Sequence, residues 1–386
     1  MLIEITPMDT LFFRDGKPFN ASEDGVTGSM FPPNPSVLYG FLRTLYFGEN
    51  PKEICKAETE NDVTKTLEIK AIYYKIGNED GYSVYFNAPL DYVYPKKESG
   101  YIREEKKNKS YEMDFLEYKN REIISNKSSF KIIPSSKEQV ENLTKIIISK
   151  NDLSNYLKNP NKKRNLGLLS DYIIQEEKTG IKKGSNRTAE EGHLYRINML
   201  RLSEKIEKNK IENIKLVVEY DGIEINTKTG ISKLGGEGKN IKYEIISKES
   251  NLFETKADLK NGYFKLILLT PSYLKNGFEP DLQIEDVELV SVCIGKAINI
   301  GGFDMAEKEP KPMFKAIPAG STFVYKINNC TEEKIKEIKE KLDFKSISDD
   351  IKYITRNITR NEPKNKIWDL SKEGFGISII GGVNID

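Results

Sequence analysis

Residues 7–43 read PMDTLFFRDGKPFNASEDGVTGSMFPPNPSVLYGFLR, a stretch that joins a charged turn, a proline-rich hinge and the start of a helix. Within the turn, Gly16 after Asp15 is free to take positive φ, and Pro18 fixes the direction in which the chain leaves. The turn therefore holds two cations, Arg14 and Lys17, near one another on a short, stiff loop.

The helix is predicted to begin after Asn34, which is a favourable N-cap, with Pro35 at the first helical position. Helical spacing then gives one apolar face made of Val37, Leu38, Phe41, Leu42, Leu45 and Tyr46, and Arg43 lies off that face. Two interpretations remain open. The stretch is either a solvated loop before a core helix, or a group of backbone donors and cations at a helix start that suits phosphate.

The chain has 386 residues, of which 38% are hydrophobic, and this length favours two domains over one. Lysine and arginine number 60 against 59 acidic residues, so the net charge of +1 gives no overall attraction to nucleic acid. Any RNA site must be a local basic patch. A charged fraction of 31% and a mean hydropathy of −0.55 indicate a soluble protein.

No run approaches the roughly 18 apolar residues of a membrane-spanning helix, and the first residues lack the pattern of a secretory signal. A cytoplasmic location is expected. Cys55, Cys293 and Cys330 are few and widely spaced, which suggests neither a disulfide framework nor a zinc site. His193 is the single histidine, so a histidine-rich metal centre is excluded. We expect no cofactor and no metal.

The first part of the chain predicts a strand over 2–5, the helix, and a hairpin over 67–75 and 82–88. This order is β-α-β-β, the first two-thirds of a ferredoxin-like unit. Residues 95–109 are charge-dense and predict an exposed insertion. Helices are predicted over 136–149 and 152–157, the second ending at Pro160.

Residues 172–202 read YIIQEEKTGIKKGSNRTAEEGHLYRINMLRL and predict a basic loop that leads into a strand over 193–202. The loop carries Lys182, Lys183 and Arg187, and the strand carries His193, Tyr195 and Arg196. These cations and aromatic rings suit phosphates and unpaired bases. A β-hairpin with a lysine-rich tip and no binding role fits the same pattern.

Residues 230–240 read GISKLGGEGKN and separate strands predicted over 214–220 and 241–246. Gly235 and Gly236 make a flexible loop whose amides can approach an anion, and Lys239 follows them. The loop lacks the GK[ST] ending of a nucleotide-binding P-loop.

The last third predicts strands over 263–269, 287–300 and 322–327 and an amphipathic helix over 331–342. Lys311 lies in a polar excursion before the third of these strands. Near the end, Gly374 and Gly376 flank Phe375, and Gly381-Gly382 interrupts the last strand. These glycines are expected to leave backbone open for a ligand or another chain.

Several of these motifs resemble the Cmr subunit three family of RAMP (repeat-associated mysterious protein) subunits. The resemblance begins with LFFRDGKPF and MFPPNPSVLYGFLRT, continues with Thr-Gly-Ile and Thr-Ala-Glu-Glu-Gly over 179–192, and includes the glycine loop. It ends with Gly-Gly-Phe-Asp, Lys-Pro and Pro-Ala-Gly-Ser over 301–321 and the glycine-rich end. It implies an α+β fold of two ferredoxin-like (RRM-like) units with insertions and glycine-rich loops. Together with the element order it predicts units over 1–205 and 206–386.

The resemblance implies a non-catalytic RNA-binding subunit of a type III-B CRISPR (Cmr) effector complex in antiviral defence. Such a subunit holds the 5′ tag of the guide RNA, docks to the large polymerase/cyclase-like Cas subunit and contacts the backbone subunits. No membrane partner is expected. The residues that we expect to bind RNA are Arg14, Lys17, Arg43, Lys182, Lys183, Arg187, His193, Tyr195, Arg196, Gly235, Gly236, Lys239, Lys311, Gly374, Phe375 and Gly376.

Two alternatives stay open. Related RAMP nucleases process guide RNA with a histidine and a tyrosine or lysine, and His193 with Tyr195 and Arg196 could form such an acid-base site. The second alternative is a scaffold that binds only protein.

Overall fold

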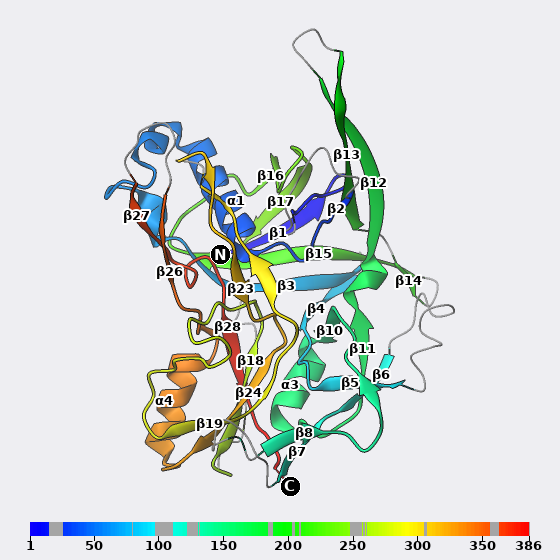
Figure 1. Ribbon diagram of the computed structural model, residues 1–386, viewed down its shortest axis with the longest axis vertical. Coiled ribbons are helices and arrows are strands. Elements are labelled where there is room, and N and C mark those ends of the chain that lie inside the picture. Colours follow the sequence, from blue (N-terminus) through cyan, green and yellow to red (C-terminus); the bar gives the residue numbers. More distant parts are fainter. Residues whose placement is uncertain are drawn as a thin grey trace.

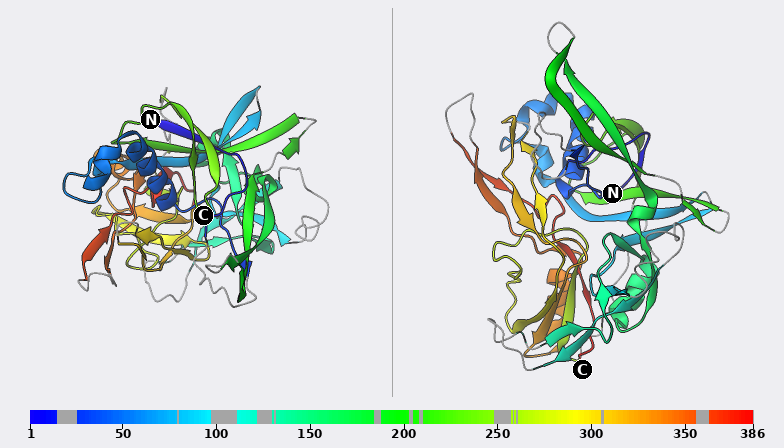
Figure 2. Two further views of the ribbon diagram at one scale, coloured as in Figure 1. Left: turned by 90° about the horizontal axis from the view of Figure 1, so that it is seen from above. Right: turned by 45° about the vertical axis from the view of Figure 1, so that its right-hand side comes forward.

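The structure, a computed structural model, describes residues 1–14, 26–78, 80–96, 111–121, 130, 132–183, 188–202, 205–207, 210–247, 257, 259, 261–304, 307–355 and 363–385. For residues 26–27, 182–183, 189–194, 205–207 and 210–211 it describes the backbone alone. Figure 1 shows a large sheet, a smaller sheet below it, and a long hairpin that projects from the body. The hairpin and the C-terminus lie at opposite ends of the molecule in Figure 1 and in the right-hand view of Figure 2.

The large sheet has 12 strands, and every pairing in it is antiparallel. Its order is β16 (Thr229–Lys233), β17 (Asn240–Ile246), β1 (Leu2–Pro7), β15 (Lys210–Asp221), β3 (Glu68–Asn78), β4 (Gly81–Asn87), β10 (Ile146–Ser149), β11 (Arg164–Leu168), β6 (Tyr111–Phe115), β5 (Tyr92–Pro95) and β9 (Val140–Glu141), with β14 (Lys205–Glu207) beside β15.

Helix α1 (Pro35–Glu49) begins at the predicted proline, although the Asn34 side chain makes no capping hydrogen bond. Its apolar face supplies Leu38 and Leu42, which are fully buried in the same core as Ile3 of β1. The Phe41 ring meets the Tyr243 ring of β17 edge-on at 6.3 Å. Full burial of one such side chain stabilises a fold by about 1.5–3 kcal/mol, so this face fixes the helix to the sheet.

The predicted hairpin over 67–75 and 82–88 is present as β3 and β4, but it does not supply the neighbour of β1. Strand β15 lies between β1 and β3 and pairs with both. Consecutive residues of β15, Val217 and Val218, are both buried, so both faces of this strand are covered. The predicted order β-α-β-β is therefore present as β1, α1, β3 and β4, with a strand from much later in the chain between β1 and β3.

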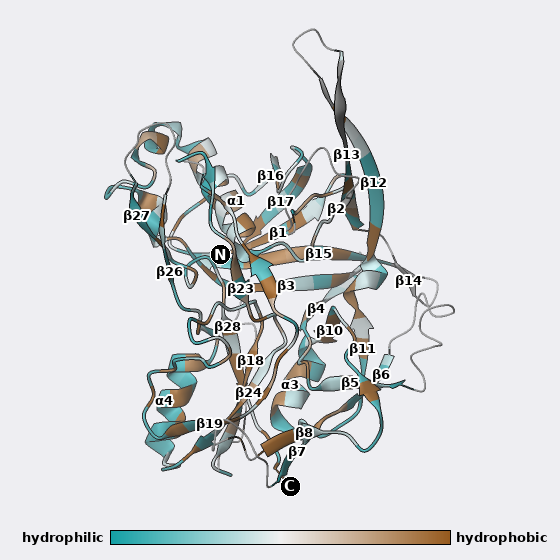
Figure 3. Ribbon diagram, viewed as in Figure 1, coloured by the Kyte–Doolittle hydropathy of each residue, from teal (hydrophilic) through white to brown (hydrophobic). Residues whose placement is uncertain are grey.

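The smaller sheet has 5 strands in the order β19 (Val287–Cys293), β24 (Thr322–Ile327), β18 (Tyr263–Leu268), β28 (Ile377–Gly381) and β25 (Lys345–Ser346). Helix α4 (Glu332–Leu342) confirms the predicted amphipathic helix, and the Thr331 hydroxyl accepts a capping bond from the Lys334 amide at 3.2 Å. Figure 3 shows the alternation of hydrophilic and hydrophobic residues along α4. Its Ile338 and Leu342 are buried.

Strand β28 lies inside this sheet, hydrogen-bonded to β18 and to β25. The amide of Gly382 donates to the carbonyl of Leu157 at 2.8 Å. The expectation that Gly381 and Gly382 leave backbone open is therefore wrong. A Cβ at Gly381 would lie 3.0 Å from the Leu157 side chain, so the glycine serves close packing.

Short ladders and helices complete the fold. One sheet of 3 strands contains β12 (Ile173–Lys183), β13 (Ala189–Leu202) and β2 (Val26–Thr27). Among the described residues there are also four two-stranded sheets: β20 (Ile298–Ile300) with β23 (Phe314–Ala316), β21 (Phe303–Asp304) with β22 (Glu309–Pro310), β26 (Ile351–Ile354) with β27 (Asn365–Trp368), and β7 (Glu117–Asn120) with β8 (Ile132–Ser135). Among the described residues, the other helices are α3 (Lys150–Lys158) and the 3-10 turns η1 (Pro51–Lys56), η2 (Val63–Thr66) and η3 (Leu169–Tyr172).

The predicted helix over 136–149 is wrong, because β9 and β10 occupy this stretch. Ile146, Ile147 and Ile148 are all buried, and three successive β-branched residues favour a strand. The next helix is confirmed as α3, whose first turn is capped by Ser149. The predicted insertion over 95–109 lies mostly outside the described residues.

The α+β class is confirmed. The large sheet spans the proposed boundary at 205/206, since β15 and β17 both pair with β1. The division at that boundary and the two ferredoxin-like units stay predictions. Within the described part of the chain, no helix has the length and apolar character needed to cross a bilayer.

Candidate nucleic-acid interface

Three segments that are distant in the sequence meet near the base of the β12–β13 hairpin. They are residues 8–14, the hairpin residues 176–178 and 200–201, and the glycine loop over 234–239, and we call this region the loop junction. Leu11 and Leu200 exchange two backbone hydrogen bonds of 2.7 and 2.8 Å. The amide of Gly236 donates to the carbonyl of Phe12 at 2.9 Å. Backbone contacts therefore fix the three segments together.

The glycines of this loop allow the close approach. Gly235 has φ of +75°, and a Cβ there would lie 2.5 Å from the Phe12 carbonyl oxygen. A Cβ at Gly236 would lie 2.9 Å from the Phe12 ring. Any larger residue at these positions would push the loop away from the opening segment, so the first role of both glycines is packing.

Exposed ion pairs connect the side chains of the loop junction. Lys239 Nζ lies 2.8 Å from Asp9, and Arg201 lies 3.6 Å from the same carboxylate. Arg201 also pairs with Glu176, and the hydrogen bond from Lys239 lowers the pKa of Asp9.

Lys178 pairs with Glu237 of the glycine loop at 2.7 Å, and Lys178 and Arg201 are both 44% exposed. Exposed pairs of this kind contribute only about 0–1 kcal/mol. Phosphate oxygens could therefore replace these carboxylates at little cost.

Of the cations predicted in the opening turn, Arg14 is exposed and forms an isolated β-bridge with Ser29, beside Phe13. Lys17 lies outside the described residues, as does Arg187. The backbones of Lys182 and Lys183 run in β12 and that of His193 in β13, while their side chains lie outside the described part.

Tyr195 faces Gly180 across the β12–β13 ladder. A Cβ on Gly180 would lie 2.2 Å from Cζ of the Tyr195 ring, so the ring lies on the glycine backbone. Tyr195 is half-buried by this contact. Arg196, next to it, is 54% exposed and lies 3.6 Å from Glu177.

The Arg43 side chain makes its contacts outside the loop junction. Its guanidinium donates to Asp62 at 2.9 Å and to the Thr64 hydroxyl at 2.8 Å. It lines a pocket of about 310 Å³ together with Lys311, which we call the Arg43–Lys311 pocket. Lys311 Nζ lies 4.3 Å from the centre of the Trp368 ring and 3.6 Å from Glu373. Two residues predicted from distant stretches are therefore brought together here.

The predicted group of Gly374, Phe375 and Gly376 is internal. Phe375 is fully buried and meets the Trp368 ring edge-on at 6.3 Å. Gly374 and Gly376 have φ of +91° and +70°, and a Cβ at Gly376 would lie 2.5 Å from the Ser348 amide nitrogen. The Phe375 ring has no exposed face on which a base could stack in this conformation.

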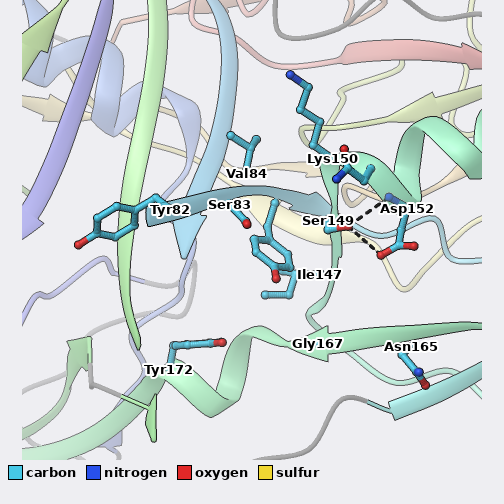
Figure 4. Close-up of a pocket in the computed structure, with 12 residues that line it drawn as sticks. Tyr82, Ser83, Val84, Ile147, Ser149, Lys150, Asp152, Asn165, Gly167 and Tyr172 are labelled. Carbon is cyan, nitrogen blue, oxygen red and sulfur yellow. Dashed lines mark hydrogen bonds between the residues drawn. The ribbon is translucent and has the colours of Figure 1, made fainter. Parts of the chain in front are cut away.

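Figure 4 shows a further concavity, which contains none of the predicted residues. It has a volume of about 550 Å³, and the residues that line it include Tyr82 of β4, Lys150 at the start of α3 and Asn165 of β11. Ser149 and Asp152, joined by two hydrogen bonds, form one wall. The sequence predicts Tyr82 in a strand, but this surface forms only because β10 pairs with β4 on one side and with β11 on the other.

The chain matches the CRISPR-associated protein family Cas_Cmr3 over residues 3–376. One similar solved chain comes from the cryo-EM structure of the Type III-B Cmr-beta bound to cognate target RNA. It is 19% identical, with a TM-score of 0.46, and the match covers 88% of this chain and 89% of that one. Another comes from the same assembly bound to cognate target RNA and AMPPnP, with 18% identity, a TM-score of 0.44 and coverage of 88% and 93%. No curated protein sequence matches the chain.

Proposed function

The chain belongs to the Cas_Cmr3 family of CRISPR-associated proteins, and from this premise we propose that it is the subunit that binds the 5′ tag of the guide RNA in a type III-B effector complex. In this proposal its chemistry is limited to binding. It docks to the large polymerase/cyclase-like subunit and contacts the backbone subunits. The β12–β13 hairpin, which projects from the body in Figure 1, offers a long surface for RNA or a neighbouring subunit.

The observation that carries the proposal is the convergence at the loop junction. Two of its three segments, residues 8–14 and the glycine loop, contain residues that the sequence alone predicts to bind RNA, and the backbones of the three segments contact one another directly. The junction presents Arg14, Lys178, Arg201 and Lys239 around a glycine loop. Cations and loop amides are the groups that grip the backbone of single-stranded RNA. In this proposal residues 8–14 form one wall of a composite RNA surface.

We also infer two ferredoxin-like units from the strand orders. The order β17-β1-β15-β3 and the order β28-β18-β24-β19 both follow the pattern fourth, first, third, second along the chain. Helix α1 follows the first strand of one unit, and α4 precedes the last strand of the other. In this inference the first unit ends with β17, which moves its boundary from 205/206 to the stretch between β17 and β18.

The experiment titrates labelled tagged guide RNA with the whole protein at several salt concentrations. In the variant, Arg14→Ala is combined with Lys17→Ala, and the control combines Lys275→Ala with Lys336→Ala, which removes two exposed lysines elsewhere. We expect the Arg14→Ala and Lys17→Ala double variant to bind RNA about 10-fold more weakly than the natural chain. Its slope of log affinity against log salt should fall by about 1.4, since each phosphate contact to a single strand contributes about 0.7. The control should bind as tightly as the natural chain.

Unchanged affinity in the variant would remove the opening loop from the RNA site. Absence of RNA binding at low salt by the natural chain, alone or with the large subunit, would favour the protein-only scaffold. A specific cut in labelled repeat RNA that is lost in His193→Ala would favour a processing endoribonuclease.

A further inference from the structure

Two concavities adjoin along helix α3, and we call the surface that they form together the α3 groove. One is the concavity of Figure 4. The other has a volume of about 700 Å³ and is lined by α3, the turn that follows it and the start of β11. Asp152 and Asn165 line both concavities, so the two meet between this helix and this strand. The groove lies outside the stretches that resemble family motifs.

Helix α3 turns an apolar side to the core and a polar side to the groove. Leu153 and Tyr156 are buried, and Tyr156 donates to the buried Asp91 carboxylate at 2.6 Å. Asn155 and Lys158 are three residues apart, so they lie on one face of the helix, and both are exposed and line the groove. The core therefore fixes the helix that presents these groove residues.

The turn after α3 is fixed from within by Arg164, which is 8% exposed. Its guanidinium donates to the carbonyls of Asn159 and Lys162 at 3.0 and 2.9 Å and to the Tyr92 hydroxyl at 2.6 Å. These three hydrogen bonds hold the backbone that carries the exposed Lys162 and Lys163. The two lysines are thus presented from a preorganised segment, which lowers the entropic cost of binding a ligand.

The α3 groove is strongly positive. The described residues that line it include four lysines and one arginine against one aspartate, whereas the whole chain has a net charge of +1. Lys163 pairs with Asp114 at 3.1 Å. Lys150, Lys158 and Lys162 form no ion pair with another described residue. Unlike the ion-paired cations of the loop junction, these three lysines can bind an anion without giving up a carboxylate.

Amides and an aromatic ring complete the groove. Its lining includes the side chains of Asn151, Asn155 and Asn165, all of them exposed. Tyr82, which is 36% exposed, lies at the β4 end. Lysines and amides suit phosphates and 2′-hydroxyls, and an exposed ring suits an unpaired base. An acidic protein segment would use the lysines but has no base for the ring, so the lining favours single-stranded RNA.

The groove is connected to the loop junction through β12. Tyr172 lines the groove, the next residue begins β12, and Glu176 of that strand belongs to the loop junction. Four residues of a strand span about 13 Å, so the two surfaces are about that far apart along the chain. One RNA strand that is held at the loop junction is therefore long enough to reach the groove with a few more nucleotides.

We propose that the α3 groove binds a second segment of the single-stranded RNA whose tag is held at the loop junction. Lys150, Lys158 and Lys162 contact its phosphates, the asparagine amides donate to phosphate oxygens or 2′-hydroxyls, and Tyr82 stacks on an unpaired base. This inference rests on the proposed function and adds to it a second binding surface with its own stretch of RNA.

The test uses two labelled oligoribonucleotides, one limited to the tag and one that continues with unpaired nucleotides. Anisotropy titrations at several salt concentrations compare the natural chain with the triple variant Lys150→Ala, Lys158→Ala and Lys162→Ala. We expect the triple variant to bind the longer RNA at least about 10-fold more weakly, with a salt slope lower by about 2, because each lost phosphate contact removes about 0.7. Its affinity for the tag alone should not change.

The matched control combines Lys52→Ala, Lys326→Ala and Lys345→Ala, which removes three exposed lysines that do not line the groove. It should bind both RNAs as tightly as the natural chain. Arginine in place of the three groove lysines keeps the charges and should keep the salt slope. Tyr82→Leu should weaken binding of the longer RNA at least about 5-fold without changing the slope, because it removes a stacking ring and no cation.

The two proposals fail in different ways. A triple variant that binds the longer RNA as its control does would overturn the α3 groove and leave the loop junction in place. Equal losses on both RNAs would also overturn the second segment, since the groove would then hold the tag itself. Unchanged RNA binding with weaker capture of the large subunit would assign the groove to a protein partner. A natural chain that binds neither RNA at low salt would overturn the proposed function.

Discussion

Lys265 and Asp91 form an ion pair inside the protein, with Lys265 Nζ 2.5 Å from Asp91 Oδ2 and the two side chains 1% and 2% exposed. Tyr156 donates to the same carboxylate at 2.6 Å, and Tyr118 donates at 3.3 Å. Asp91 precedes β5 of the large sheet, while Lys265 lies on β18 of the smaller sheet. A saturated polar cluster therefore connects the two sheets through the interior.

Removing one partner of this ion pair should lower the free energy of unfolding. In Lys265→Met, Asp91 stays buried without its cation, and breaking a buried pair in this way costs about 3–5 kcal/mol. We expect a corresponding fall in the free energy of unfolding by urea. The double variant Lys265→Met with Asp91→Asn should recover part of the loss, since no unpaired charge remains. A single variant within about 0.5 kcal/mol of the natural chain would contradict the burial of the pair.

Local patterns were sufficient where the sequence itself contains the physical reason. Proline at the first helical position defines α1, and threonine followed by two glutamates defines the start of α4. The stretch YFKLILL predicts β18 correctly, but it contains Lys265, whose partner Asp91 is 174 positions away. Spacing along the chain carries no information on such a partner, and the neighbour of β1 was missed for the same reason.

The candidate RNA site was likewise only partly predictable from the sequence. Glycines and cations mark the loop junction in the sequence, because their conformational freedom and charge are properties of single residues. Their contacts depend on tertiary structure. Lys239 meets Asp9 across the junction, and Phe375, which resembles an RNA-stacking residue between two glycines, is part of the core.

Gly235→Ala, compared with a control, tests whether the contact between the glycine loop and Phe12 matters beyond the cost of a positive φ. The new Cβ would meet the Phe12 carbonyl oxygen at 2.5 Å, in a backbone conformation with φ of +75°. We expect a loss of about 1–3 kcal/mol in unfolding free energy and weaker RNA binding. Gly238→Ala is the matched control, because Gly238 also has positive φ, at +62°, but no atom within 4 Å of its added Cβ.

In the Gly238→Ala control, the free energy of unfolding should fall by only about 1 kcal/mol, the cost of placing alanine at positive φ. Its RNA affinity should not change. Equal effects of the two substitutions, measured by urea unfolding and RNA titration, would show that contact with Phe12 does not matter.

Glu4 makes stability depend on pH. Burial by itself would raise the pKa of Glu4, but hydrogen bonds from Lys75 and Lys215 outweigh it and lower the pKa below the usual 4.5. A lowered folded-state pKa gives a contribution that is present above the unfolded pKa and is lost as pH falls through the folded one. The difference in unfolding free energy between the natural chain and Glu4→Gln should therefore be largest above about pH 5 and shrink below about pH 4.

Urea unfolding of both proteins over this pH range measures that difference. A difference that stays constant with pH would mean that the carboxylate of Glu4 has the same pKa in the folded and unfolded chain.

Arg43→Ala tests whether this arginine contributes to folding or to the grip on RNA phosphates. The Asp62 side chain that it contacts is 2% exposed, and Asp62 also accepts hydrogen bonds from the amides of Glu58 and Thr64. Because these amides remain, we expect a moderate loss of about 1–3 kcal/mol in unfolding free energy. Thr44→Ala is the neighbouring control, since the Thr44 hydroxyl bonds only within the helix, to the Gly40 carbonyl.

The salt dependence of RNA binding then separates the two roles of Arg43. An arginine committed to Asp62 makes no phosphate contact, so the slope of log affinity against log salt should equal that of the Thr44 control even if the affinity falls slightly. A slope reduced by about 0.7 would instead assign one phosphate to Arg43. The guanidinium would then have to leave Asp62 when RNA binds, and Arg43 would bind RNA as well as stabilise the fold.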